Sequence, residues 1–344
     1  MNAREDFLVR RKSGIGGSDI AAIMGLSPWK SPVGVYLDKL SPVVDAELPS
    51  EAAMWGIKLE DIIARHYSTK TGNKIQRINS LVVHPTNRIF IANPDRMIVR
   101  PGSIVRVSES GVMGATRGLE VKTASAYKAG EWGTEYDDDA VPTHYAAQCM
   151  WYLGVTGLDH WDVACLIGGQ RYVCKTIERD DSVIDAMFDA AQRFWDGHII
   201  KQIPPEPITS SDVVKLWPTD NGAMVAANAK TLELLARAQE LRAQIAALEL
   251  ELDGDAKLGI GGITGSLKAF IGEASGVELA GRVLATFKKA KDSRTTDWES
   301  LFRWLSQSIV AERPDMAPMI YAAVADNTTI RTGSRRLLIK EHKQ

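Results

Sequence analysis

The stretch Gly118-Leu119-Glu120-Val121-Lys122 is the segment from which the fold of this 344-residue chain can be predicted. Its apolar residues, Leu119 and Val121, alternate with the charged residues Glu120 and Lys122. Alternation with a period of two is typical of a β-strand, and it places both charges on the same face. Alone, the pattern also fits an ordinary surface strand in which Glu120 and Lys122 form a salt bridge.

A second apolar run lies upstream, at residues 89–92, and it ends at Asn93-Pro94-Asp95. An aspartate at the end of one strand, followed by Glu-x-Lys on another, is typical of metal-dependent phosphodiester hydrolysis. The carboxylates can hold a hard divalent cation through oxygen, and the lysine then lies beside the metal-bound water. Asp95, Glu120 and Lys122 are therefore the first candidate site residues.

The composition is that of a soluble globular protein, with 45% apolar and 24% charged residues. The net charge of −2 shows no overall basicity, but a local basic groove is enough for a nucleic acid. Three cysteines are too few for a disulfide framework or a cysteine-rich zinc site, and the six histidines show no paired ligand spacing. No apolar run is long enough for a membrane span, so we expect a cytoplasmic protein with no membrane partner.

A glycine-rich segment near the N-terminus precedes a helix that we expect to begin at Ser18-Asp19. Glycines allow backbone amides to approach a ligand, a helix N-terminus favours an anion, and Arg10, Arg11 and Lys12 add positive charge. The segment is either a phosphate pocket or a plain glycine-rich helix cap. It is not a dinucleotide-binding fingerprint, because no apolar strand leads into it and the glycine spacing is wrong.

Two predicted helices carry further candidates. The helix over residues 51–71 has Glu60 beside its apolar face, where a carboxylate needs a partner: a metal, a water, or an arginine such as Arg65. The helix over 143–153 carries Gln148 and Tyr152 one turn apart on one face. This pair could position a phosphate or a water, or it could be structural. Strands are expected over residues 74–84, 89–99, 103–108 and 118–123 as a meander, then over 161–167 and 171–177.

The composition changes after the proline-rich segment 204–207, which reads as a stiff linker. Beyond it, a coiled segment over about 226–253 has apolar residues at alternating spacings of four and three. With only about three heptads, we expect it to pack on its own chain rather than to form a long dimer. The tail is basic, with strand character over 277–289 and 328–339, and its cations could contact phosphates or simply face solvent.

Together these stretches resemble the YqaJ-type viral recombinase nucleases, relatives of the phage lambda exonuclease within the PD-(D/E)xK superfamily. The resemblance covers roughly residues 8 to 205 and rests on five segments in the expected order. They are RKSGIGGSD at 11–19, WGIKLE at 55–60, NPD at 93–95, LEVK at 119–122, and Gln148. It implies an α/β (α+β) restriction-endonuclease-like core with a central mixed sheet flanked by helices. The nuclease domain would span residues 1–205, and residues 206–344 would form a C-terminal extension.

The resemblance also implies roles for the metal site. Asp95 and Glu120 would ligate Mg2+, helped by the Val121 carbonyl, and Mn2+ is expected to substitute. Lys122 would orient the attacking water and help to deprotonate it. Glu60 would contact the metal or its water, and Gln148 would position the nucleophile or the scissile phosphate.

A second set of implied roles concerns the DNA end. Arg11 and Ser18 match the pocket that holds the 5′-terminal phosphate in the lambda enzyme, and Asn93 and Tyr152 would also face the DNA. Asn93 stands where the lambda enzyme has a serine, and the stretch between Asp95 and Glu120 is longer here. Both departures concern end recognition rather than the metal site.

The implied activity is Mg2+-dependent 5′-to-3′ degradation of double-stranded DNA ends, which releases 5′-mononucleotides and leaves a 3′ overhang. The overhang would pass to a single-strand annealing protein for phage-type homologous recombination in a bacterial host, and lambda-type enzymes are toroidal trimers. Two alternatives stay open. One is an endonuclease on the same fold, and the other is a non-catalytic module that binds DNA or a partner.

Overall fold

The computed structural model describes residues 9–41, 50–133, 140–293 and 295–328, and the chain divides into two compact units. The first unit ends at Pro218 and the second begins at Thr219. The first therefore extends past residue 205, because helix α7 (Ser210–Leu216) packs against α3 (Pro32–Leu40). Ser31, the N-cap of α3, donates a hydrogen bond of 2.5 Å to Asp212 of α7.

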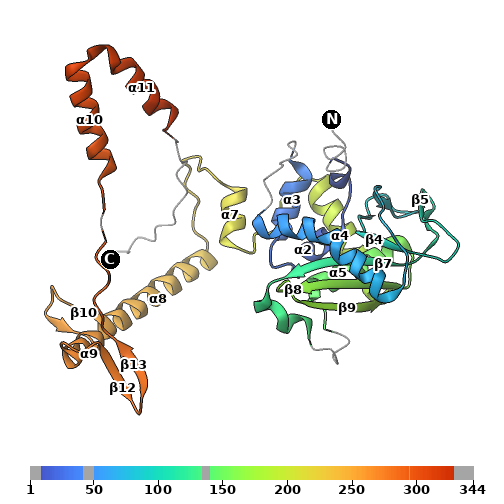
Figure 1. The fold of residues 1–344 in the computed structure, drawn as a ribbon, viewed down its shortest axis with the longest axis horizontal. Coiled ribbons are helices and arrows are strands. Elements are labelled where there is room, and N and C mark those ends of the chain that lie inside the picture. The colour runs from blue at the N-terminus through green and yellow to red at the C-terminus, as the bar shows by residue number, and fades with distance from the viewer. Residues whose placement is uncertain (1–8, 42–49, 134–139, 294, 329–344) are drawn as a thin grey trace. The chain divides into compact units, whose positions relative to one another are not determined.

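A five-stranded sheet forms the centre of the first unit (Figure 1). The strand order is β1-β4-β7-β8-β9, in which β7 and β8 are parallel and every other neighbouring pair is antiparallel. The predicted mixed sheet is thus confirmed. The strands are β1 (Ile75–Gln76), β4 (Arg96–Val99), β7 (Ala115–Ala124), β8 (His160–Ile167) and β9 (Arg171–Glu178).

Helices cover both faces of strand β7. Leu119 and Val121 pack on one face against helix α4 (Glu51–Thr71), in a cluster that includes Ile63 and Tyr67. On the other face, helix α5 (Thr143–Thr156) contacts β8 and β9 and extends over β7 through Gln148. The alternation of residues 118–122 is confirmed, but the surface-strand alternative is wrong, because both faces of β7 are buried.

The remaining helices of this unit pack around α5. Helix α2 (Gly17–Ile23) lies directly on it, and α6 (Asp181–Phe194) contacts both. Asp180 caps α6 by accepting hydrogen bonds from the backbone of Ser182 and Val183, and a π-helical turn over Trp195–Ile200 continues the helix. A 3₁₀ helix, η1 (Ala126–Trp132), follows β7 in the crossover to β8.

The predicted meander is wrong in detail, because two of its strands are broken. β2 (Val82–Val83) pairs with β3 (Ile91–Ala92), and β5 (Arg106–Ser108) pairs with β6 (Gly111–Met113), both outside the central sheet. The strand predicted over 89–99 is interrupted at Pro94, which lies between β3 and β4, because proline has no N–H to donate to a neighbouring strand.

The second unit begins with the long helix α8 (Ala229–Asp253). Among the described residues of this unit, most of its coiled-coil seam is exposed, which differs from the expected packing on its own chain. The exposed seam residues are Leu234, Leu241, Ile245, Leu248 and Leu252.

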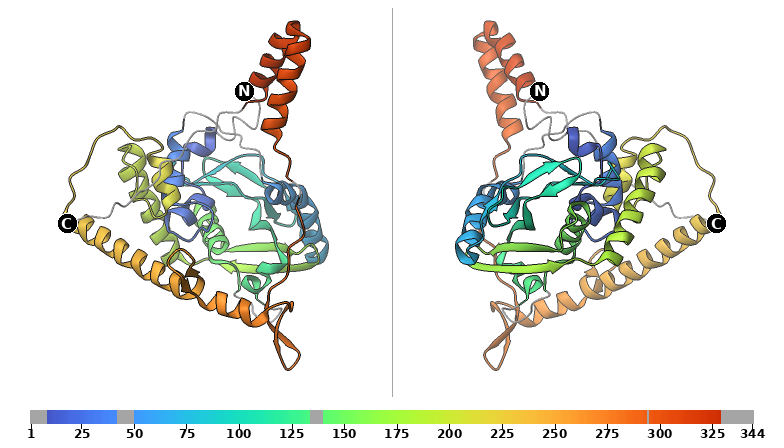
Figure 2. Two further views of the ribbon diagram at one scale, coloured as in Figure 1. Left: turned by 90° about the vertical axis from the view of Figure 1, so that its left-hand side faces the viewer. Right: turned by 90° about the vertical axis from the view of Figure 1, so that its right-hand side faces the viewer.

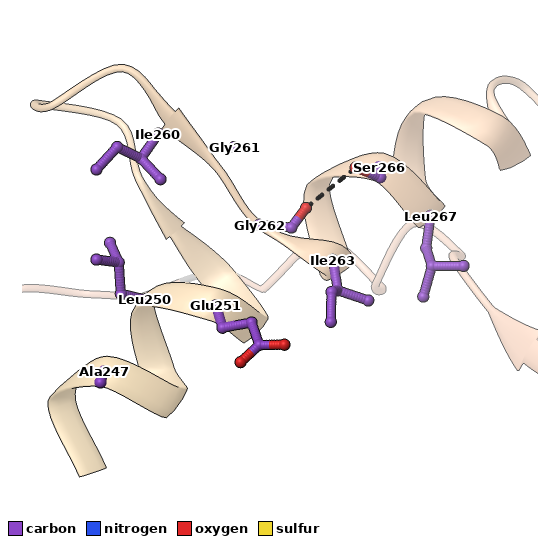
Figure 3. A pocket seen from close by; sticks show the side chains of 9 residues that line it. All are labelled: Ala247, Leu250, Glu251, Ile260, Gly261, Gly262, Ile263, Ser266 and Leu267. Atoms are coloured by element: carbon purple, nitrogen blue, oxygen red, sulfur yellow. Dashed lines mark hydrogen bonds between the residues drawn. The ribbon is translucent and has the colours of Figure 1, made fainter. Parts of the chain in front are cut away.

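The end of α8 meets two short elements to form an apolar groove of about 710 Å3 (Figure 3). These elements are strand β11 (Ile260–Gly261), which pairs with β10 (Gly254–Asp255), and helix α9 (Ile263–Ile271). Ser266 Oγ donates to the Gly262 carbonyl at 3.2 Å and closes the first turn of α9. Leu250, Ile260 and Leu267 are among the apolar residues that line the groove.

A hairpin and two helices complete the described part of this unit. β12 (Gly276–Leu279) pairs with β13 (Arg282–Thr286), which agrees with the strand character predicted over 277–289. Helix α10 (Trp298–Glu312) is followed by α11 (Ala317–Asp326), both drawn in red in Figure 2, and residues of both helices line one pocket. The strand predicted over 328–339 lies, after its first residue, outside the described residues. Within the described ranges, no helix combines the length and apolar content that a bilayer span requires.

Candidate active site

One cavity of about 220 Å3 brings together the predicted site residues, with the exception of Glu60 and Val121. It lies where the start of α2, the end of β3, strand β7 and helix α5 meet. Segments separated by more than a hundred residues thus converge on one point, as the five-segment pattern requires. The predicted residues in its wall are Arg11, Ser18, Asn93, Asp95, Glu120, Lys122, Gln148 and Tyr152.

Glu120 lies at the centre of the cavity wall, with its side chain only 3% exposed. Its Oε1 accepts hydrogen bonds from Lys122 Nζ at 2.5 Å and from Gln148 Nε2 at 2.6 Å. The other oxygen, Oε2, is buried and has no hydrogen-bond partner within the described part of the chain. A buried carboxylate oxygen without a donor is costly. A bound cation could satisfy this oxygen.

Asp95 is held against the start of the Glu-x-Lys segment. Its Oδ2 accepts a hydrogen bond from the backbone N–H of Val121 at 2.8 Å. Burial, and then the nearby charge of Glu120, raise the pKa of Asp95 well above its ordinary value. Burial likewise raises the pKa of Glu120, although Lys122 opposes the shift. Burial therefore favours the protonated form of both carboxyls, and a nearby positive charge opposes this effect.

Lys122 keeps its charge in this environment. Burial alone would lower the pKa of its ammonium, but the carboxylates of Glu120 and Asp95 outweigh burial and raise the pKa above its ordinary value. The ammonium also lies 4.8 Å from the ring centre of Tyr145. The raised pKa favours the charged ammonium, which suits Lys122 to orienting a water and to balancing negative charge.

The residues described in the structure contain no cluster of three or more His, Cys, Asp or Glu with metal-binding geometry. A cation in this cavity would therefore be held by Asp95 and Glu120, with backbone carbonyl or water oxygens in its other positions. Mg2+ commonly binds in this way, through one or two carboxylates and several waters. The donor set fits a hard cation, because all its donors are oxygen.

Glu60 lies outside the cavity, and of the partners considered for it, a metal, a water or an arginine, the structure shows an arginine, Arg96. Arg96 Nη1 donates to Glu60 Oε1 at 2.7 Å, and the same nitrogen donates to the Asp95 carbonyl at 2.6 Å. Arg65 instead pairs with Asp61. Arg65, the example considered in the sequence, lies on the same helix as Glu60, whereas Arg96 comes from strand β4. In this arrangement Glu60 holds Arg96, and Arg96 holds the backbone of Asp95.

The predicted phosphate pocket forms the other wall of the cavity. Arg11 Nη2 donates to Ser18 Oγ at 2.7 Å, so the two residues separated by seven positions meet. Gly17 makes this possible by close packing: a Cβ there would lie 2.8 Å from Gln148 and from Tyr152. Gly17 therefore allows α2 to approach α5 closely.

A buried ion pair that the sequence analysis missed supports this wall. Asp19 is fully buried and lies 2.7 Å from Lys39 and 3.3 Å from Lys30. Burial would raise the pKa of Asp19, but Lys39 and Lys30 outweigh it and hold the pKa well below its usual range. Asp19 also accepts from the backbone N–H of Gly16, and Lys39 donates to the Arg11 carbonyl at 2.8 Å. The network therefore holds the backbone at Gly16 and at Arg11, two residues that line the predicted phosphate pocket.

Gln148 and Tyr152 contact each other as their spacing predicted. Gln148 Nε2 donates to the Tyr152 hydroxyl at 3.0 Å, and that hydroxyl donates to the Asn93 carbonyl at 3.3 Å. Tyr152 is buried, whereas Asn93 is exposed at the mouth of the cavity. The pair thus connects Glu120 to Asn93, which follows β3. These contacts are compatible both with a structural role and with the positioning of a phosphate or a water.

Comparison with known proteins finds similarity over the first unit. Residues 6–159 match the family model described as YqaJ-like viral recombinase domain. The chain is 40% identical over 200 residues to the uncharacterized protein YqaJ of Bacillus subtilis (strain 168), a stretch that is 58% of this chain. The chain spans 57% of the length of that relative.

Solved structures are also similar to part of the chain. One is an alkaline exonuclease from Laribacter hongkongensis, with 19% identity, a TM-score of 0.43, and coverage of 57% of this chain and 93% of that one. Another is a phage related exonuclease from Haemophilus somnus 129PT, with 13% identity and a TM-score of 0.41. It covers 55% of this chain and 96% of that one.

Proposed function

From the match of residues 6–159 to the YqaJ-like viral recombinase domain, we propose that the protein is a Mg2+-dependent deoxyribonuclease that degrades duplex DNA from its 5′ ends. The observation that carries the proposal is the single cavity in which Asp95, Glu120 and Lys122 face Arg11 and Ser18. One side offers oxygens to a cation, and the other offers hydrogen-bond donors to a phosphate.

The chemistry at the acidic side is phosphodiester hydrolysis. A divalent cation bound there would polarise the phosphate and lower the pKa of a water. Lys122, held at 2.5 Å by Glu120, orients that water and balances the charge that builds on the phosphorane. Gln148 Nε2 donates to Glu120 at 2.6 Å and to the Tyr152 hydroxyl at 3.0 Å, so it would exchange one of these two bonds in order to donate to the water or to the scissile phosphate. Mn2+ should replace Mg2+, because both are hard cations that accept oxygen ligands.

The chemistry at the basic side is recognition of a terminal phosphate. The guanidinium of Arg11 matches a phosphate in a bidentate fashion, and Ser18 Oγ adds a donor at the same point. A terminal phosphate bound here places the next phosphodiester toward Glu120 and Lys122. The product is then a 5′-mononucleotide, and repeated cleavage leaves a 3′ overhang. We further propose that the overhang passes to a single-strand annealing protein and that the enzyme acts as a homo-oligomer.

Digestion of three DNA substrates tests the proposal. With Mg2+, we expect mononucleotide release from linear duplex DNA with 5′-phosphate ends, slower release from 5′-hydroxyl ends, and none from a closed circle. The Arg11→Ala variant should lose the preference for 5′-phosphate, by about tenfold or more, because the loss of a charged hydrogen bond to phosphate costs about 1.5–3 kcal/mol. Arg10→Ala is the matched control, since Arg10 is an exposed neighbour that lies outside the cavity.

Each contrary result points to a different function. Cutting of the closed circle would replace the exonuclease with an endonuclease on the same fold. DNA binding without cleavage in Mg2+ or Mn2+ would indicate a non-catalytic DNA-binding module. An unchanged end preference in Arg11→Ala would remove the terminal-phosphate role of the basic side and leave the metal site intact.

Thermal unfolding at several pH values tests the cation site without reference to activity. The raised pKa values of Asp95 and Glu120 mean that the folded state binds protons more tightly than the unfolded state. Stability from these two groups therefore falls as the pH rises through their raised pKa values, and a cation that replaces the protons reverses the loss. Mg2+ should raise Tm by about 5 °C at a hundred times its Kd, and more at about pH 8 than at about pH 6.

The control separates site binding from a general ionic effect. Glu120→Gln should abolish the Mg2+-induced shift in Tm, whereas Asp185→Asn, on the exposed side of α6, should retain it. An equal shift in both variants would show that the cation binds elsewhere.

A further inference from the structure

An aromatic cluster lies next to the cavity, and the proposed chemistry does not use it. Tyr145, at the start of α5, receives Lys122 over its ring at 4.8 Å and lies 5.7 Å from Trp132. Trp29 stacks edge-on against His144 at 4.6 Å and lies 5.8 Å from Tyr145. A continuous path of side chains therefore leads from the ammonium of Lys122 through Tyr145 to Trp29.

Trp29 is 71% exposed although its loop is well anchored. The backbone N–H groups of Trp29 and Lys30 both donate to Ser27 Oγ at 3.3 Å. The side chain of Lys30, the next residue, forms ion pairs with Asp19 and Asp38. Because the indole of Trp29 is held in solvent, it does not contribute the stabilisation that a tryptophan normally gains from burial.

His144, the residue beneath Trp29, is also poorly satisfied. Its Nε2 is buried and has no hydrogen-bond partner among the described residues. Burial lowers the pKa of the His144 imidazole, which favours the neutral ring, and the ring contacts Trp29 edge to face. A local arrangement that leaves one ring exposed and one polar atom unpaired works against stability, and such arrangements are expected at functional sites.

We propose that Trp29, supported by His144, is a stacking site for an unpaired nucleobase of the DNA strand whose phosphate lies at Lys122. The inference rests on the proposed nuclease function and extends it to the bases. A nucleobase is the occupant that fits, because the exposed surface is a flat π-face next to a site for the same strand's phosphate. Stacking of a base on an aromatic side chain tolerates every base, as a sequence-independent nuclease requires.

The test measures stacking and not cleavage. Duplex DNA with a short 5′-phosphorylated single-stranded extension carries the fluorescent base 2-aminopurine at each extension position in turn. All proteins are full-length and carry Glu120→Gln so that the DNA stays intact. The variants compared on this background are Trp29→Ala, Trp29→Leu, which keeps an apolar side chain without a ring, and Trp29→Phe, which keeps a ring.

We expect 2-aminopurine at one position to be quenched by the parent and by Trp29→Phe, and not by Trp29→Ala or Trp29→Leu. The Kd for the extended DNA should rise about tenfold in the alanine and leucine variants, which is within the range for one stacked base. The Kd for blunt duplex should change by less than about twofold, since its bases are already stacked on each other.

The outcomes distinguish this inference from the proposed function. Unchanged quenching at every position in Trp29→Ala would overturn the stacking site, while a wild-type protein that digests DNA would leave the nuclease standing. Quenching that depends on Trp29, in a protein whose wild-type form cuts no DNA, would keep the stacking site and refute the nuclease. A parent protein that binds no DNA would overturn both.

Discussion

Glu120→Gln or Asp95→Asn should reduce DNA cleavage by about a thousandfold or more and leave the Kd for DNA nearly unchanged. Each substitution removes one negative charge from the proposed cation site and keeps the size of the side chain. The positive charge that stabilises the transition state by several kcal/mol is then lost or misplaced. Most of the affinity for DNA comes from phosphate contacts, and these do not involve the two carboxylates.

The measurement is the initial rate of nucleotide release together with a binding assay on the same DNA. Glu178→Gln, at the exposed end of β9, is a control that should cleave at the normal rate. A Glu120→Gln protein that cleaves normally would refute the assignment of this cavity as the active site. Loss of cleavage with an equal loss of DNA binding would instead point to a disturbed fold, which thermal unfolding would reveal.

The parts of the site that could be predicted from the sequence are those with a local pattern. Alternation over residues 118–122 placed Glu120 and Lys122 on one face, and the structure joins them at 2.5 Å. A spacing of four residues on a helix predicted the contact between Gln148 and Tyr152. Asp95 could be nominated because it ends an apolar run. In each case one short segment contains the whole signal.

The parts that could not be predicted depend on partners from distant segments. Arg96 holds Glu60 across 36 positions of sequence, and nothing in either helix or strand pattern selects that arginine. Asp19 looked like a helix-opening residue, although its burial depends on Lys30 and Lys39 from the following loop and helix. The periodicity and propensity of a segment predict which of its faces is buried. They do not predict which charged residue of a distant segment will pair with that face.

Sequence patterns also failed to predict where strands are interrupted and whether an apolar seam is buried. The strands predicted over 74–84 and 89–99 have adequate alternation, yet each splits in two, because the short hairpin β2–β3 pairs outside the main sheet. The seam of α8 has the spacing of a buried surface but lies exposed within this chain. Spacing predicts that a face can be buried, and only the fold determines whether the chain itself buries it.

Asp19→Ala should cost about 3–5 kcal/mol in the free energy of unfolding of the first unit. The side chain of Lys39 is only 1% exposed, so the loss of Asp19 leaves a buried ammonium without its counter-charge. The substitution also removes the acceptor for the Gly16 N–H, at the point where α2 begins. Denaturant unfolding, followed by tryptophan fluorescence, measures the change, and Asp38→Asn, which breaks only the more exposed pair with Lys30, should have a much smaller effect.

Two further measurements show that the buried charge pair is the cause. The double variant Asp19→Leu with Lys39→Met should recover much of the lost stability, because apolar side chains of similar size can replace a buried ion pair. The pKa of Asp19 is lowered in the folded state, so its stabilising contribution is complete above about pH 4 and declines as the pH falls below that value. Wild type should therefore lose more stability than Asp19→Ala between about pH 5 and pH 3. Parallel stability curves for the two proteins over that range would show that Asp19 acts through packing rather than through its charge.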